Sequence, residues 1–269
     1  MRKSIVVVFL LAGLLLSACG AAGETGTLSI TGSTTVQPLA EKLAESFMSS
    51  NPDVQIDVQG GGSSVGVKAA GEGTSDIGMA SREVKAEELA QFKNMQVHVI
   101  ARDGIAIVVN PENSVNDLSL DQIRDIFSGK IVNWSEVGGA DAAITVVARE
   151  EGSGTRDAFM EMVMGKDALI LDNAILQSSN GAVRTVVSTT PNAIAFLSFG
   201  YLDESTKALS IGGAAPTEEN ASSGVYPVVR PLNLLTDGAP EGLVKAFLDF
   251  VLSADGQAMV REEGYIPVK

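Results

Sequence analysis

The 269-residue sequence predicts an α/β protein, because strand-like and helix-like runs alternate and loops rich in Gly, Ser and Thr follow the strands. The clearest loop is Arg149-Glu-Glu-Gly-Ser-Gly-Thr-Arg156, which a strand-like run at 144–148 precedes and a helix-like run at 157–164 follows. With 28 glycines and only 5% aromatic residues, the composition suits many tight turns. The length suffices for one large domain or for two lobes with an ample core.

Apolar spacing and turn residues place the other elements. Leu39, Leu43 and Phe47 recur at helical spacing after Pro38, which suits a first helical turn, and Asn51-Pro52 ends that helix. The segment 118–122 has the form of a capping box and predicts a helix to residue 127. Strands are also expected at 28–31, 54–58, 76–79, 104–110, 193–197 and 226–232, further helices to about 71 and at 181–189, 241–252 and 256–263, and a loop at 214–224.

Four of the expected loops share hydroxyl and glycine residues directly after a strand. They are Gly32-Ser-Thr-Thr35, Gly60-Gly-Gly-Ser-Ser64, Ala80-Ser-Arg-Glu83 and the loop that begins at Arg149. Loops at the carboxyl ends of strands in an open α/β sheet converge on one crevice. The sequence therefore predicts a single site to which all four loops contribute.

The loop after Arg149 has the chemistry of an anion site. Gly152 and Gly154 lack a Cβ and let the backbone approach a ligand closely. Ser153 and Thr155 are suitable N-cap residues for the following helix, whose first N–H groups are free and lie at the positive end of the helix dipole. Arg149 and the next arginine, at 156, add full positive charges on both sides of the loop.

The N-terminus predicts export and a lipid anchor. Arg2 and Lys3 precede an apolar run at 5–16, which fits a secretory signal and is too short to span a bilayer. The segment Leu16-Ser-Ala-Cys19 resembles the bacterial lipobox, in which the cysteine is lipidated after cleavage. We expect a signal peptide at 1–18, lipidation at Cys19 and a flexible tether at 19–26. The alternative is a plain cleaved signal with an incidental cysteine.

The charge balance limits the classes of partner. Removal of the signal leaves 17 basic and 33 acidic residues, a formal charge of −16. That excess of negative charge argues against nucleic acid and against anionic lipid headgroups as partners. It does not exclude a small buried anion, because local donors and dipoles hold such a ligand.

One pattern favours an enzyme instead. Gly62-Ser-Ser-Val-Gly66 matches the nucleophile elbow of hydrolases, with Ser64 as the nucleophile. The mechanism also needs a histidine late in the chain, whereas the single histidine, His98, lies early on an expected strand. The sequence has no Walker phosphate loop, no dinucleotide motif and no calcium-loop spacing, so no cofactor or metal is expected. The serine hydrolase therefore stays the less favoured alternative.

Taken together, the loop motifs resemble those of the phosphate-binding proteins of bacterial and archaeal phosphate ABC importers. The resemblance rests on Thr31-Gly-Ser-Thr-Thr-Val-Gln-Pro38, Gln59-Gly-Gly-Gly-Ser-Ser64, Asp76-Ile-Gly-Met-Ala-Ser-Arg82, Arg149-Glu-Glu-Gly-Ser-Gly-Thr155, and Trp134 before Gly138-Gly139. It covers nearly all of the mature chain. It implies a two-lobed periplasmic-binding-protein fold of type II, with mixed sheets flanked by helices and phosphate closed between the lobes.

The resemblance also implies which residues bind phosphate. From the first lobe these would be Thr34, Thr35, Ser63, Ser81 and Arg82, and from the second lobe Arg149, Ser153, Gly154 and Thr155. The protein would be a monomeric, non-enzymatic receptor that is anchored outside the cytoplasm and delivers phosphate to a membrane permease. Another oxyanion, such as sulfate, molybdate or tungstate, is the alternative ligand.

Two further expectations complete the interpretation. The first lobe should comprise 27–108 plus 226–269, and the second lobe 109–225, because three of the loops precede Gly104 and the fourth follows Ile144. Some relatives carry an aspartate where this chain has Arg82, and that aspartate accepts the proton of hydrogen phosphate. Asp76, Glu150, Glu151 or a backbone carbonyl could replace it, and we favour Glu151 because it lies inside the central loop.

Overall fold

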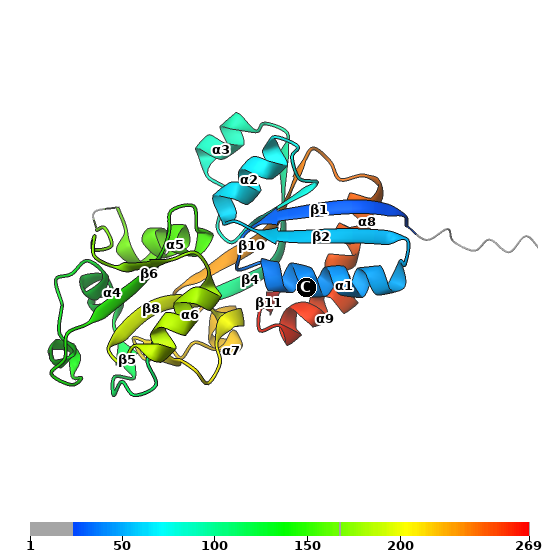
Figure 1. The fold of residues 1–269 in the computed structure, drawn as a ribbon. Coiled ribbons are helices and arrows are strands. Elements are labelled where there is room, and N and C mark those ends of the chain that lie inside the picture. Colours follow the sequence, from blue (N-terminus) through cyan, green and yellow to red (C-terminus); the bar gives the residue numbers. More distant parts are fainter. Residues whose placement is uncertain (1–23, 167, 269) are drawn as a thin grey trace, which may run out of the picture.

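The fold is seen in a computed structural model that describes residues 24–166 and 168–268 (Figure 1). The expected signal peptide at 1–18, the lipidation site at Cys19 and the first part of the tether therefore lie outside the described residues. Within the described ranges, none of the helices has both the length and the apolar character needed to cross a membrane.

The first lobe is built on parallel strands at one end of a mixed sheet. β1 (Gly26–Gly32) pairs in parallel with β2 (Val54–Gly60) and with β3 (Ile77–Ala80). β10 (Val229–Asp237) runs antiparallel to β3 and to β4 (Met95–Val109), and the short β11 (Ile266–Pro267) also pairs with β4. Since β1, β2 and β3 are parallel, their carboxyl ends lie at the same edge.

The second lobe continues the sheet from the far half of β4. There β4 pairs antiparallel with β8 (Ala193–Ser198) and β9 (Lys207–Ile211), and the short β5 (Asp117–Leu118) pairs with β9. β6 (Thr145–Arg149) is parallel to β8 and to β7 (Ile175–Gln177). The main strand order is β2-β1-β3-β10-β4-β8-β6-β7, and β4 passes from one lobe to the other (Figure 1).

Helices cover both faces of the first lobe's sheet (Figure 1). α1 (Gln37–Ser50), α8 (Gly242–Val251) and α9 (Ala254–Glu262) pack together on one face, while α2 (Ser63–Gly71) and α3 (Ala86–Gln91) lie on the other. The second lobe carries α4 (Leu120–Phe127), α5 (Gly154–Phe159), α6 (Asn180–Thr189) and α7 (Glu218–Ser222), with 3-10 turns at Trp134–Val137 and Phe199–Tyr201 and a π-turn at Met160–Met164.

The described residues form two large hydrophobic cores, which define the lobes, and a third small cluster in the first lobe that includes Val67, Met95 and Leu235. One large core contains buried residues from Leu28 to Ala101 together with residues from Leu232 to Tyr265, and the other runs from Ile105 to Val228 with Ile266 added. The chain therefore changes core near 102–104 on β4 and near 229–231 on β10. The expected boundaries at 108/109 and 225/226 stay a prediction, and the cores assign 105–109 and 226–228 to the second lobe.

Most of the expected elements are present, and the exceptions have local causes. The capping box at Ser119 opens α4, since Ser119 Oγ accepts from Gln122 N and Gln122 Oε1 accepts from Ser119 N. The segment expected as a loop at 214–224 contains α7, which is only five residues long. β10 begins three residues later than expected and extends to Asp237, because its partner β4 continues to Met95. The strands β5, β7, β9 and β11, each of two to five residues, were not predicted.

Candidate functional site between the lobes

Three of the four glycine- and hydroxyl-rich loops meet at the carboxyl ends of β1, β2 and β3. Ser33 Oγ accepts hydrogen bonds from the backbone N–H groups of Thr35 and Val36 and donates one of 2.9 Å to Ser81 Oγ. The N–H of Ser81 donates to Ser63 Oγ at 3.0 Å. Ser33, Ser63 and Ser81 are all buried. The first-lobe loops thus converge, as the sequence predicts, and the structure shows that their serine hydroxyls join them.

The fourth loop packs against these serines from the second lobe. A Cβ built on Gly154 would lie 2.1 Å from Ser63 Oγ and 2.7 Å from Ser81 Oγ, so only glycine allows this approach. A Cβ on Gly62, which has a φ of +96°, would lie 2.9 Å from the backbone oxygen of Gly152. The N–H of Ser64 donates to that same oxygen at 3.2 Å. The two lobes are therefore in direct contact around this site.

Threonine hydroxyls complete the contact between the lobes. Thr35 Oγ1 lies 3.0 Å from Thr155 Oγ1 and accepts a 2.8 Å hydrogen bond from Asn180 Nδ2. The amide orientation of Asn180 follows from its other bond, because its Oδ1 accepts from the N–H of Ser198. Ser153 is the N-cap of α5, and its hydroxyl accepts from the N–H of Arg156.

Arg149 is a buried cation without a carboxylate partner in the described chain. Its Nε donates to the Gln177 carbonyl at 3.1 Å, and its Nη2 donates to the Ser178 carbonyl at 2.8 Å and to Thr34 Oγ1 at 3.1 Å. Its Nη1 is buried and has no hydrogen-bond partner among the described residues. Burial, reinforced by the charge of Arg230, lowers the pKa of Arg149 to about 10. Both effects favour a bound anion.

A second buried arginine lies behind the Thr35 hydroxyl. Arg230 Nη2 is 3.4 Å from Thr35 Oγ1 and 2.8 Å from Asp103 Oδ2, and its Nε also donates to that oxygen. Asp103 is fully buried and accepts two more hydrogen bonds through Oδ1, from Ser198 Oγ and from the N–H of Phe199. Burial raises the pKa of Asp103, and the bonds from Arg230, Ser198 and Phe199 oppose that rise.

Arg82 is buried at the same junction, but other protein groups occupy its guanidinium. Nη1 and Nη2 donate to the two carboxylate oxygens of Glu88 at 2.8 and 2.7 Å, and Nη2 also donates to Ser64 Oγ at 3.3 Å. Nε forms a 2.9 Å ion pair with Asp157 of the second lobe, without the alignment of a hydrogen bond. Nη1 also donates to the Glu83 carbonyl at 2.9 Å. The expected side-chain contact of Arg82 with a ligand therefore competes with five protein contacts.

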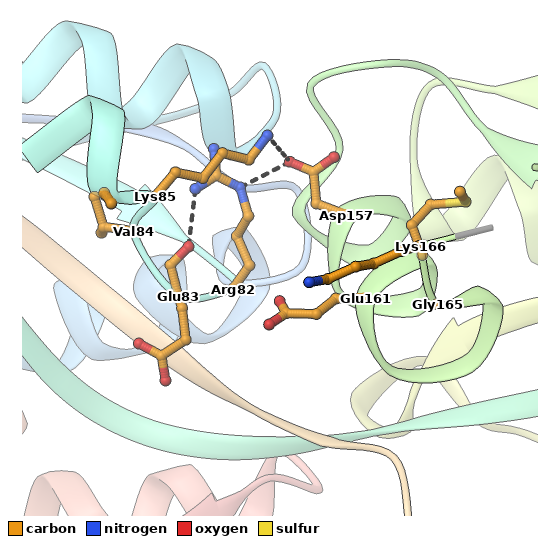
Figure 2. Close-up of a pocket in the computed structure, with 10 residues that line it drawn as sticks. Arg82, Glu83, Val84, Lys85, Asp157, Glu161, Gly165 and Lys166 are labelled. Atoms are coloured by element: carbon orange, nitrogen blue, oxygen red, sulfur yellow. Dashed lines mark hydrogen bonds and ion pairs between the residues drawn. The ribbon is translucent and has the colours of Figure 1, made fainter. Parts of the chain in front are cut away.

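A surface cavity of about 590 Å³ opens beside the ion pair that bridges the lobes between Arg82 and Asp157. In Figure 2, Arg82 and Lys85 reach from one side toward Asp157, while Glu161 and Lys166 line the other side. Lys85 Nζ lies 3.1 Å from Asp157 Oδ2. Glu88 on α3 also belongs to this junction, since its carboxylate pairs with Arg82.

Several site residues were not found by sequence reasoning. Tyr201 Oη donates to the Thr34 carbonyl at 2.7 Å, and Tyr265 Oη donates to the Thr35 carbonyl at 2.8 Å, so both hold the first loop in place. Asn180 follows β7, which has only three residues and gave no strand signal. Its N-cap neighbour Ser179 was the available signal, since the helix after it was predicted.

The structure separates the groups that the hydrolase alternative needs. Ser64 Oγ accepts from Arg82, whereas His98 lies on β4 with its Nε2 3.0 Å from Thr236 Oγ1. No His, Cys, Asp or Glu cluster in residues 24–166 and 168–268 is arranged to hold a metal ion. The histidine base that a nucleophilic Ser64 would need is therefore engaged elsewhere in the first lobe.

The proton acceptor favoured from the sequence, Glu151, stays a prediction, and its exposure argues against it. Glu150 and Glu151 are exposed, and Asp76 is exposed and accepts from the N–H and hydroxyl of Ser29. An acceptor that discriminates between anions must be buried against the ligand, because water would otherwise satisfy the lone pair. Glu151 is unsuited to this role for a physical reason, since it lies at the exposed tip of a turn before the N-cap Ser153.

The site as a whole is an assembly of hydrogen-bond donors. Asn180 can only donate to Thr35 Oγ1, which leaves the Thr35 hydrogen free for Thr155 or for a ligand. Ser33 likewise receives two backbone donors and passes its own hydrogen to Ser81. With the unpaired Nη1 of Arg149, this arrangement suits a small, compact oxyanion.

Comparison with known proteins agrees with this chemistry. Residues 18–255 match the model of the PBP superfamily domain. The chain is 38% identical to the phosphate-binding protein PstS of Bacillus subtilis (strain 168), over 99% of this chain and 95% of the relative. It is 29% identical to the phosphate-binding protein PstS of Borreliella burgdorferi, over the full length of both.

Solved structures give the same result. A protein of Clostridium perfringens, described as a phosphate ABC transporter substrate-binding protein and solved with bound phosphate, superposes with a TM-score of 0.87 at 44% identity, over 91% of this chain and 100% of the other. An ABC-type phosphate transport receptor of Vibrio cholerae gives 0.75 at 35% identity, over 89% and 99%. These relatives are binding proteins, and the chain is not an enzyme. The two-lobed fold, the donor site and these similarities together show that the chain belongs to the PBP superfamily, in the family of bacterial phosphate-binding proteins.

Proposed function

We propose that the protein captures inorganic phosphate between its two lobes and delivers it to the permease of an ABC importer. The observation that carries the proposal is Arg149, a buried guanidinium with an unpaired Nη1 at the point where four donor loops meet. A buried cation of this kind needs an anion, because an uncompensated charge is costly in a low-dielectric interior. The relatives named above for phosphate binding support phosphate as that anion.

The proposal assigns roles to the expected site residues. Arg149 donates charge-assisted hydrogen bonds, and the hydroxyls and loop amides around it donate the remaining ones. These donors are Thr34, Thr35, Ser63 and Ser81 from the first lobe and Ser153, Gly154 and Thr155 from the second. Arg82 acts through its neighbours, because it holds the Ser64 hydroxyl and joins the lobes through Asp157.

Export and anchoring belong to the same proposal. The apolar run at 5–16 and the lipobox-like segment that ends at Cys19 support a lipoprotein signal peptide at 1–18 and an extracytoplasmic location. The names of the relatives, which refer to ABC transport, support delivery to membrane permease subunits. We expect the protein to act as a monomer.

Titration calorimetry tests the ligand. The purified protein, dialysed exhaustively against phosphate-free buffer, should bind one phosphate per chain, and a large excess of sulfate should change the apparent affinity little. Equal competition by sulfate would instead support the alternative of a broader oxyanion receptor, and tight binding of molybdate or tungstate alone would identify a different cargo.

Detergent phase partition tests the anchor. The chain expressed in a bacterial host should enter the detergent-rich phase, and the variant Cys19→Ser should move to the aqueous phase. If both partition alike, the lipobox interpretation is wrong, while the phosphate site is unaffected.

A further inference from the structure

Arg230 is built into the strand that joins the lobes. It lies on β10 directly opposite Asp103 of β4 in the antiparallel register, at the position where the chain changes from one hydrophobic core to the other. The side chain is 1% exposed and that of Asp103 is 0% exposed. Its Nη2 lies 3.4 Å from Thr35 Oγ1, so the guanidinium end reaches the first loop of the anion site.

Arg230 and Arg149 are held in the same way. In each guanidinium, Nε and Nη2 are anchored by protein oxygens, and Nη1 is buried without a hydrogen-bond partner among the described residues. The anchors differ in charge, since Arg149 is held by two neutral carbonyl oxygens and Arg230 by the carboxylate of Asp103.

The unpaired Nη1 distinguishes Arg230 from a structural ion pair. A buried pair is stable when further bonds satisfy its remaining donors and acceptors. Asp103 meets that condition, because each of its oxygens accepts two hydrogen bonds. Arg230 does not, because a buried N–H group on Nη1 has no acceptor in the described chain. Such a group needs an acceptor from outside the chain.

We propose that Arg230 is a second guanidinium ligand of the bound anion and donates to it through Nη1, with Asp103 fixing the orientation of the fork. This inference rests on the proposed function, because it assigns a further residue to the same oxyanion site. A bound oxyanion would satisfy both bare Nη1 groups and would separate two cations that otherwise repel each other.

The assignment also sets the charge of the site. Asp103 compensates Arg230, and Glu88 with Asp157 compensates Arg82, so of these three buried arginines Arg149 is the one without a carboxylate partner in the described chain. Because Asp103 is present, the site holds the guanidinium groups of both Arg149 and Arg230 but carries only one net positive charge from this set. The second fork adds direction, because a planar guanidinium accepts an oxyanion edge in a fixed geometry.

The test replaces the pair by a neutral, hydrogen-bonded one. In the double variant Asp103→Asn/Arg230→Gln, the introduced amide oxygen can still accept from Ser198 and Phe199, and the amide nitrogen beside it can donate to the new side chain at 230. Calorimetric titration of the full protein should show phosphate affinity reduced by at least about tenfold, since a charge-assisted hydrogen bond is lost. Thermal unfolding of the double variant, followed by circular dichroism, checks that the variant is folded.

A second variant protects the test against misfolding. Arg230→Lys keeps a positive charge opposite Asp103, but its single nitrogen cannot occupy both the carboxylate edge and the Nη1 position. It should also lose about tenfold in affinity. The matched control is Asp125→Asn/Lys130→Gln, which removes a 3.0 Å surface ion pair within the second lobe and should leave the affinity within about twofold.

The outcomes separate this inference from the proposed function. Phosphate affinity within about threefold of wild type in a folded Arg230 variant would overturn the inference and leave phosphate binding intact. Titrating the wild type and the variants with sulfate tests the case in which the protein binds a different anion. If the wild type binds sulfate in place of phosphate, the phosphate assignment fails, and the Arg230 variants decide the inference on sulfate. A wild type that binds neither anion overturns both.

Discussion

At the scale of single residues, the site depends on how burial changes the value of a charge. Arg149 is 2% exposed and has no ion-pair partner in the described chain, whereas Lys85 is exposed and pairs with Asp157. A charge-assisted hydrogen bond from a desolvated guanidinium is strong, and an exposed ammonium contributes little because water screens it.

Arg149→Ala should therefore weaken phosphate binding by about 10- to 150-fold, and Lys85→Ala by less than about threefold. Calorimetry on both variants under identical buffer and salt conditions measures the difference. Equal effects of the two substitutions would remove Arg149 from the centre of the site.

His98 is a half-buried titratable group that should act on stability without acting on binding. Burial lowers the pKa of His98, which lies between β4 and β10 against Thr236. The unfolded chain, with an ordinary histidine pKa near 6.5, therefore takes up the proton at a higher pH than the folded chain. By linkage, the contribution of neutral His98 to the free energy of unfolding is fully present above pH 6.5. It decreases as the pH falls below that value.

In the variant His98→Gln this pH dependence should be weaker between about pH 6.5 and 5, above the range where most carboxylates titrate. Urea unfolding at pH 7.5 and 5.0 measures it, and phosphate affinity at pH 7.5 should equal that of wild type. A loss of phosphate affinity in this variant would show that His98 contributes to phosphate binding.

At the scale of elements, strands deliver the site residues and helices hold them in register. β1, β2 and β3 end at one edge with Ser33, Ser63 and Ser81 close behind, and β6, β7 and β8 bring the second set to the same place. Between these sets, α3 and α5 face each other through the bridge of Arg82 to Asp157, which Lys85 reinforces.

This bridge forms only when the lobes are together, so it should affect release more than capture. Asp157→Asn should speed phosphate dissociation by about three- to tenfold, because loss of one partner of a partly buried charge pair acts mainly on the dissociation rate. Stopped-flow release into a phosphate trap measures it. Asp121→Asn, which removes a surface pair with Arg124, is the control. An unchanged dissociation rate would reduce the bridge to a packing contact.

The sequence predicted those features of this arrangement that depend on residues adjacent in the chain. The capping box at Ser119, Pro38 in the first turn of α1 and the four glycine- and hydroxyl-rich loops were all recognisable from adjacent residues. Their convergence followed from the rule for carboxyl ends of strands and is confirmed by the bonds among Ser33, Ser63 and Ser81.

The rest of the site depends on contacts between distant segments. Arg230 and Asp103 are 127 positions apart and both lie inside extended strands, where nothing in the local pattern distinguishes a hinge pair from ordinary strand residues. Asn180 and Tyr201 follow the second-lobe strands β7 and β8, and the three-residue β7 is too short to give a periodic signal. The exposure of Glu151, which argues against it as the proton acceptor, could not be predicted from its position within the loop.

At the scale of the whole molecule, the site couples ligand binding to the separation of the lobes. Three hydrogen bonds connect the two lobes around the buried guanidinium groups: Thr35 with Thr155, Arg149 with Thr34, and Tyr201 with Thr34. Without an anion, the buried and unpaired charge of Arg149 disfavours this closed arrangement, because burial and, second, the charge of Arg230 lower the pKa of Arg149. With an anion the same charge favours it.

Phosphate should therefore shift the protein from an open to a closed population. The radius of gyration from small-angle X-ray scattering should decrease when phosphate is added to phosphate-free protein, with β4 and β10 bending near 102–104 and 229–231, where the chain changes core. Arg149→Ala should abolish the decrease at phosphate concentrations that saturate the wild type, because the variant lacks the main interaction that distinguishes the two states. Asp121→Asn should behave as wild type. An equally compact wild type with and without phosphate would show that the anion enters a preformed site, and that the unpaired charge of Arg149 is not enough to open the lobes.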